Sequence, residues 1–133
     1  MIHIIDAGPM IAFLNGEPGR PIIEQILIDN PGECYAHFMN LFEVYYIFLR
    51  RGGVKAAEAA MQTLTGVGIQ TCYDHDETFW KEAATLKAWN NMSPPDGFCL
   101  ALAKRMNGTV VTTDHGELDK MVVVNYAPIL FIR

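Results

Sequence analysis

A length of 133 residues fits one domain, residues 1–133, and a composition of 50% hydrophobic and 19% charged residues is that of a globular protein. The formal net charge of −5 argues against a broad, non-specific nucleic-acid binder, which would normally be basic, although clustered acidic metal ligands would add to this charge. Cys34, Cys72 and Cys99 lie far apart, so we expect reduced thiols rather than disulfides or a zinc site. No secretory leader is apparent, and the apolar run Leu41–Leu49 is too short to span a bilayer, so we expect a cytoplasmic protein.

The first part of the chain alternates short apolar runs with helical patterns. Ile2–Ile5 is rich in β-branched residues and ends at Asp6, which predicts a buried strand with a carboxylate at its carboxyl end. Helices are predicted over Met10–Leu14 and Ile22–Ile28, with glycine and proline turns between them. A second strand is predicted over Cys34–Phe38.

Asn40 stands where a residue can cap a following helix, predicted over Leu41–Arg51 and ended by Gly52–Gly53. A further helix is predicted over the alanine-rich segment Val54–Leu64, and a third strand over Val67–Tyr73.

The second part of the chain continues this alternation. We predict helices over Asp76–Trp89 and, after two prolines, Phe98–Met106, then a strand over Thr109–Thr113. One helical turn over Gly116–Met121 and a last strand over Ile129–Ile132 follow. This order predicts an α/β fold with a mainly parallel five-stranded sheet and helices on both faces.

Two carboxylates follow predicted strands. Asp6 ends the first strand and Asp114 ends the fourth, and ligands of open α/β sheets collect outside the carboxyl ends of the strands. We therefore expect both side chains at one edge of the sheet. Either residue taken alone is more simply explained as a turn former or helix cap, and the two together at strand ends weaken that explanation.

Glu43 lies in a helix that is apolar nearly all round, which predicts burial on most faces. A buried carboxylate needs a cation, a partner or a raised pKa. Pairing with Arg50 or Arg51, or a solvent-facing position, would also explain Glu43, and the helix alone does not decide between these readings.

Asp96 follows Pro94 and Pro95 at the start of a helix, where an acidic residue suits the helix dipole. Alternatively, the prolines direct it across the strand ends. Four carboxylates meeting at one edge would repel one another without cations, whereas Mg²⁺ or Mn²⁺ would turn them into a phosphodiester-cleaving site.

Four segments together resemble the motifs of the PIN domain and, within it, of VapC toxins. They are Ile4–Leu14, Phe38–Val44, Asp96–Ala103 and Val110–Asp114. The resemblance spans nearly the whole chain. It implies that Asp6, Glu43, Asp96 and Asp114 form a metal site that hydrolyses RNA with Mg²⁺ or Mn²⁺. It also implies a homodimer and a cognate antitoxin protein.

The chain departs from the family pattern at a few positions. Gly8 stands where many members carry Ser or Thr, and Asn40 stands where Ser or Thr is common. Asn40, Thr113 and Glu117 are candidates for supporting roles, although a solvated helix face is the simpler explanation for Glu117. His115 is either a base or, more simply, an exposed turn residue.

Basic and aromatic residues also have two readings each. Arg50, Arg51 and Lys55 form the densest basic patch, with Lys104 and Arg105 as another, and both suit either RNA phosphates or plain surface solvation. The helical spacings of four aromatic residues suit core packing or a dimer interface; these are Tyr45, Tyr46, Trp80 and Trp89.

Two other functions fit the same pattern. One is an inactive PIN-like scaffold that binds RNA or protein, and the other is a metal-dependent phosphatase. Nucleotide-cofactor chemistry is unsupported, because the chain has no glycine-rich loop of the Walker or Rossmann form.

Overall fold

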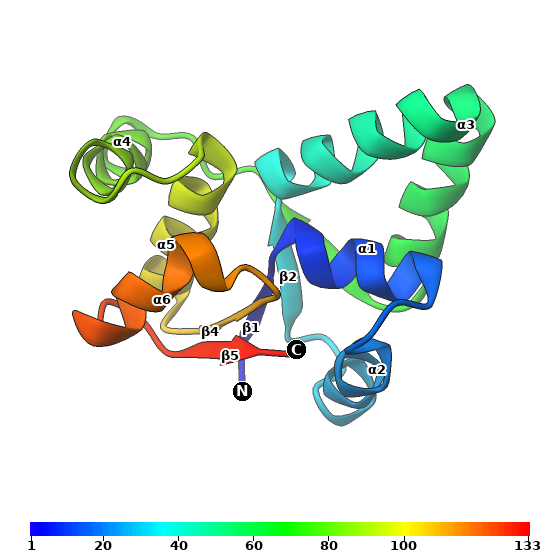
Figure 1. The fold of residues 1–133 in the computed structure, drawn as a ribbon, viewed down its shortest axis with the longest axis horizontal. Coiled ribbons are helices and arrows are strands. Elements are labelled where there is room, and N and C mark those ends of the chain that lie inside the picture. Colours follow the sequence, from blue (N-terminus) through cyan, green and yellow to red (C-terminus); the bar gives the residue numbers. More distant parts are fainter.

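The computed structural model describes all 133 residues, in which five strands alternate with six helices (Figure 1). The strands are β1 (His3–Ile5), β2 (Cys34–His37), β3 (Ile69–Cys72), β4 (Thr109–Thr112) and β5 (Ile129–Phe131). The helices are α1 (Ala7–Asn15), α2 (Arg20–Asp29), α3 (Phe38–Gly66), α4 (Glu77–Asn90), α5 (Pro94–Met106) and α6 (His115–Val123). The predicted α/β class is confirmed.

The five strands form one parallel sheet in the order β3-β2-β1-β4-β5. The chain moves outward from β1 through β2 to β3 and then crosses back to place β4 on the other side of β1. The order therefore reverses between β1 and β4. In open α/β sheets this reversal leaves a crevice at the carboxyl ends of the two strands.

Each face of the sheet carries its own apolar layer because neighbouring strand residues point in opposite directions. Ile4 and Val110 pack with residues of α4, α5 and α6, whereas Ile5 and Val111 pack with residues of α1, α2 and α3. Figure 1 shows these two groups of helices on opposite sides of the sheet. The predicted cover on both faces is confirmed.

Helix α3 differs from its prediction at its start. It begins at Phe38, and its cap is His37, whose side chain accepts a hydrogen bond from the Met39 amide, so the prediction of Asn40 as the cap is wrong. The predicted break at the glycine pair is confirmed. Gly53 has φ 78° and ψ −172°, which are not helical values, so α3 consists of two helical segments joined across a kink.

The first half of α3 is far more exposed than its apolar sequence predicts. Phe42 is 60% exposed, Leu49 39% and Tyr46 38%, so burial on most faces is wrong. Figure 1 shows the reason, since this half projects away from the sheet and few elements cover it.

Core packing is also wrong for Trp80 and Trp89, which are 46% and 82% exposed. No helix combines the length and the apolar character that crossing a membrane would require.

Candidate active site

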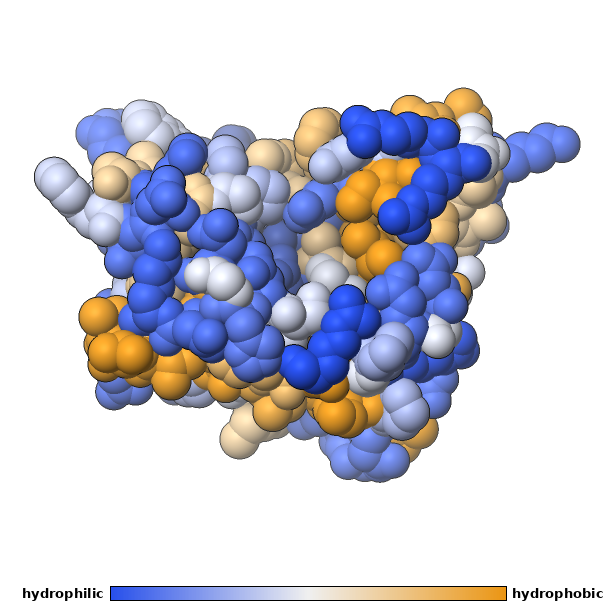
Figure 2. Space-filling model, in the orientation of Figure 1, coloured by the Kyte–Doolittle hydropathy of each residue, from blue (hydrophilic) through white to orange (hydrophobic).

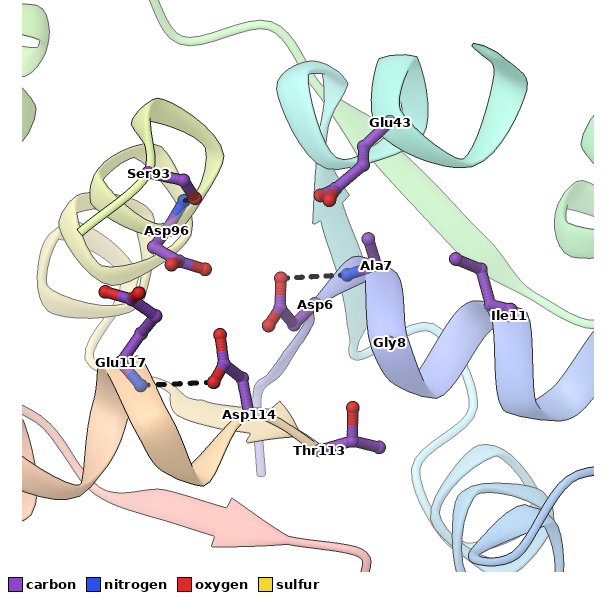
Figure 3. A pocket seen from close by; sticks show the side chains of 10 residues that line it. All are labelled: Asp6, Ala7, Gly8, Ile11, Glu43, Ser93, Asp96, Thr113, Asp114 and Glu117. Atoms are coloured by element: carbon purple, nitrogen blue, oxygen red, sulfur yellow. Dashed lines mark hydrogen bonds between the residues drawn. The ribbon is translucent and has the colours of Figure 1, made fainter. Parts of the chain in front are cut away.

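A cavity of about 510 Å³ opens at the carboxyl ends of β1 and β4, where the strand order reverses (Figure 3). Its lining residues are Asp6, Ala7, Gly8, Ile11, Glu43, Ser93, Asp96, Thr113, Asp114 and Glu117. Five of these are acidic and none is basic. All four carboxylates singled out from the sequence thus line one pocket, although they come from four separate segments.

Asp6 is the most deeply placed of the acidic residues, at 4% exposed. It caps α1 by accepting a hydrogen bond from the Ala7 amide at 2.8 Å, and it accepts another from the Thr112 hydroxyl at 2.8 Å. Burial raises the pKa of Asp6 to about 6, even though these two hydrogen bonds act to lower it. Asp6 is therefore both the cap of α1 and a lining residue of the cavity.

Asp114, which follows β4, likewise caps a helix and lines the cavity. One carboxylate oxygen accepts a hydrogen bond from the Glu117 amide at 3.1 Å and caps α6. The Asp114 amide in turn donates to the Thr112 hydroxyl at 3.0 Å. Thr112 therefore connects Asp6 and Asp114, and Figure 3 shows both carboxylates facing the same cavity. Glu117 also lines that cavity.

Asp96 enters the pocket from the first turn of α5. Ser93 caps this helix, and the two prolines occupy its first positions. Asp96 is 6% exposed, and burial followed by the charge of Asp6 raises its pKa to about 7. Its place in the first turn is consistent with the helix dipole, and its side chain also reaches across the strand ends toward Asp6 (Figure 3).

Glu43 reaches the cavity from α3, on the opposite side from Asp96 (Figure 3). Burial raises its pKa, and the charges of Asp96 and Asp114 raise it further. It forms no ion pair with Arg50 or Arg51, so the pairing that the sequence left open is absent. Glu43 therefore lies among like charges with no base to offset them.

Asn40 connects Asp6 with the segment that carries Asp96. It is fully buried, and its amide nitrogen donates to Asp6 Oδ1 at 3.1 Å and to the Pro95 carbonyl at 3.3 Å. Its oxygen Oδ1 is buried with no hydrogen-bond partner. Such an unsatisfied acceptor is costly unless a donor such as water reaches it.

Gly8 and Thr113 make a close contact at the rim of the pocket. A Cβ added to Gly8 would overlap the Thr113 hydroxyl, Oγ1. The space that a side chain at position 8 would fill is thus occupied by a hydroxyl from a different segment. The missing hydroxyl at position 8 has a structural counterpart in Thr113.

The donor set suits a hard divalent cation held partly through water. No group of three or more His, Cys, Asp or Glu side chains is arranged to hold one ion directly between them. Mg²⁺, however, keeps several waters and uses only one or two carboxylates directly. An acidic, open cavity without a single basic residue offers both the oxygens and the room for those waters. The residues therefore fit such an ion.

Two residues of the site were not singled out from the sequence. Thr112 bridges Asp6 and Asp114, and Ser93 caps the helix that carries Asp96. Ser93 before two prolines is a recognisable capping signal. Thr112 has no local signal, because its contact with Asp6 depends on the pairing of Ile5 with Val111 in the parallel ladder.

Two other candidates lie outside the cavity. His115 is exposed and bonds to Asp119 and the Arg133 carbonyl, in keeping with its reading as a surface residue. Arg105 is paired with Asp74 and Asp76, so its charge is already neutralised by the protein, which weakens that basic pair as an RNA contact.

A family model for the PIN domain matches residues 3–122. The chain belongs to the PIN-domain family. No curated protein matches this PIN-domain chain in sequence.

Solved structures of low sequence identity share the fold over nearly the full length. A DNA-bound VapBC from Salmonella typhimurium aligns with a TM-score of 0.76 at 14% identity, covering 100% of this chain and 99% of the other. VapBC2 from Rickettsia felis, bound to a promoter fragment, gives 0.75 at 13%, covering 98% of each chain. VapC20 from Mycobacterium tuberculosis, a toxin that cleaves the sarcin-ricin loop, gives 0.70 at 15%, covering 89% and 94%.

Proposed function

We propose that this PIN-domain protein is a divalent-metal-dependent endoribonuclease and the toxin of a toxin–antitoxin pair. The observation that supports this most strongly is the shared cavity of Asp6, Glu43, Asp96 and Asp114, which contains no base. Ionised carboxylates held so close together without positive charge repel one another, and a bound cation would remove that cost. The similarity in fold to toxin structures agrees with this reading.

We assign metal ligation to Asp6, Asp96 and Asp114, with Glu43 as a ligand or as the group that orients the attacking water. A bound Mg²⁺ or Mn²⁺ would supply an activated water at neutral pH and stabilise the leaving oxygen. Glu43 is suited to accept a proton from water because its pKa is raised and its side chain is only half-buried. Asn40 and Thr112 would hold Asp6 in a fixed orientation, while Thr113 and Glu117 would line the path of the substrate.

Cleavage of a mixed-sequence RNA in the presence of Mn²⁺ tests this function. We expect the Asp6→Asn variant to lose about 100-fold or more in rate, because it keeps the size of Asp6 but lacks its charge. Asp29→Asn is the matched control, since Asp29 is an exposed carboxylate at the end of α2, outside the cavity. Calorimetric titration with Mn²⁺ should show binding to the parent and weaker binding to Asp6→Asn.

Three outcomes would contradict the proposal. Equal cleavage by the parent and Asp6→Asn would remove the acidic cavity from the reaction. Absence of both cleavage and Mn²⁺ binding would leave an inactive scaffold. Hydrolysis of a small phosphomonoester, with none of RNA, would favour a phosphatase.

We also propose an antitoxin protein and a second copy of the chain as partners, on the basis of the structural likeness to VapBC complexes. A short reading frame for a DNA-binding protein directly upstream would support the first partner. Co-purification of its product with this chain, and loss of RNA cleavage in the complex, would test it. Light scattering on the isolated chain would measure the second.

A further inference from the structure

An exposed row of side chains follows the first half of α3, outward from the acidic cavity. Phe42 and Tyr46 lie one turn apart with ring centroids 5.8 Å from each other, and the Arg50 guanidinium lies 5.5 Å from the Tyr46 ring centroid. Phe42 is 60% exposed and Tyr46 38%. We call Phe42, Tyr46 and Arg50 the α3 stripe. Its rings and cation are open to a partner rather than packed in the core.

The α3 stripe begins beside the cavity. Glu43, Tyr46 and Arg50 are three and four residues apart, so they share one helix face. Arg50 lies about 10 Å along the helix axis from Glu43, given the rise of an α-helix. An extended substrate strand whose reacting group lay at Glu43 would therefore pass over Tyr46 and reach Arg50 about 10 Å further along the helix.

The positive charge available to a partner is concentrated at the outer end of this stripe. Of the ten Lys and Arg residues, four are in ion pairs, namely Arg20, Lys81, Arg105 and Arg133. Three of the other six, Arg50, Arg51 and Lys55, lie within six residues of one another around the kink, and all are exposed. In Figure 2 strongly hydrophilic side chains flank an apolar patch on the α1 and α3 side of the hollowed face. This local charge is opposite to the net charge of the molecule.

We propose that the α3 stripe binds the single-stranded RNA next to the cleaved bond, with one base stacked on Tyr46 and a phosphate at Arg50. This inference rests on the proposed ribonuclease function. Aromatic faces accept any base, and Arg contributes both charge and stacking. The exposed cations at the outer end of the stripe, Arg50, Arg51 and Lys55, favour a polyanion such as RNA as the occupant.

Fluorescence anisotropy with a short labelled single-stranded RNA tests the proposal in an Asp6→Asn background, in which cleavage is blocked. We expect Tyr46→Leu to weaken binding about 10-fold, because it keeps apolar volume but lacks a ring face, and Tyr46→Phe to bind like the parent. Arg50→Gln should weaken binding and reduce the salt dependence of log K by about 0.7. Lys104→Gln, which removes an unpaired charge on α5, is the control and should change neither.

Unchanged RNA affinity in both Tyr46→Leu and Arg50→Gln would overturn the proposal. So would a shift from dimer to monomer by light scattering in these variants with RNA affinity intact, since that result assigns the stripe to a second copy. If the parent binds RNA with the expected sensitivities but never cleaves it, the proposed ribonuclease function fails and the RNA surface stands. If the parent cleaves RNA and both variants bind RNA with the affinity of the parent, the ribonuclease function stands and the proposed RNA surface fails.

Discussion

Asp6 is held in place by neutral donors rather than by a positive charge. The Ala7 amide, the Thr112 hydroxyl and the Asn40 amide all donate to its carboxylate. Neutral hydrogen bonds orient a carboxylate without cancelling its charge, and burial still raises the pKa of Asp6 to about 6. The side chain is therefore oriented by the protein and still free to bind a cation.

The contact between Gly8 and Thr113 leads to a prediction about packing at the rim of the cavity. We expect Gly8→Ser to destabilise the protein by about 1–3 kcal/mol, because the new Cβ would overlap the Thr113 hydroxyl. Thr113→Gly should relieve this overlap, so the double variant should be more stable than Gly8→Ser alone. Urea denaturation of the four proteins in a double-mutant cycle measures the coupling. Additive effects of the two substitutions would show that the overlap has no energetic weight.

Helix α3 carries three separate tasks along its 29 residues. Its first two turns place Asn40 against Asp6 and Glu43 at the cavity, its exposed first half carries the α3 stripe, and its last turns pack Leu64 into the core. The kink at Gly53 joins a first helical segment that leaves the sheet to a second that returns to it (Figure 1). The shape of this helix thus depends on a backbone conformation that glycine alone adopts readily.

Gly53→Ala should therefore cost about 1–3 kcal/mol of unfolding free energy, because φ 78° with ψ −172° is strained for any residue with a Cβ. Gly66→Ala is the matched control. Gly66 lies at the end of the same helix, has no positive φ and has open space around its Cβ, so the change should be within about 1 kcal/mol. Urea denaturation compares the two, and equal losses would show that the kink is not strained.

On the scale of the whole molecule, the reversal of strand order brings like charges together at one edge of the sheet. Asp6 and Asp114 follow the adjacent strands β1 and β4, while Glu43 and Asp96 come from helices on opposite faces of the sheet. Burial raises the pKa values of Asp6, Glu43 and Asp96, and the neighbouring carboxylates raise them further, so ionising these groups in the folded protein costs free energy. Part of the folding free energy is therefore given up to assemble the cavity.

This cost makes the stability of the metal-free protein depend on pH. The folded pKa values of about 6 for Asp6 and about 7 for Asp96 exceed the ordinary 3.8, so the native state binds more protons than the unfolded chain between these values. The free energy of unfolding should then fall as the pH rises from about 4 to about 7. Thermal melts in a chelator at about pH 5 and pH 8 measure this fall.

Asp96→Asn is the control for this dependence, since it keeps the size of the side chain and cannot ionise. We expect the melting temperature of Asp96→Asn to fall less than that of the parent between about pH 5 and pH 8. In separate melts without chelator, added Mn²⁺ should raise the melting temperature of the parent more than that of Asp96→Asn. If both proteins lose the same melting temperature, other groups cause the pH dependence.

Local patterns were sufficient to predict the strands, the α/β class and the carboxylates at strand ends. The β-branched run before Asp6 and the run before Asp114 identify β1 and β4, because strand propensity and alternation act between near neighbours. The ends of α4 follow equally from Asp76 and Asn91, which cap it. Each of these features depends on residues only a few positions apart.

Tertiary structure alone decided which atoms meet and which faces stay open. Thr112 binds Asp6 because β1 and β4 are in one particular register, and Thr113 fills the space beside Gly8 for the same reason. The α3 stripe is exposed because no element packs over it, although its sequence alone resembles a buried helix. Register and burial depend on the relative positions of segments distant in sequence, and a local pattern carries no information about those positions.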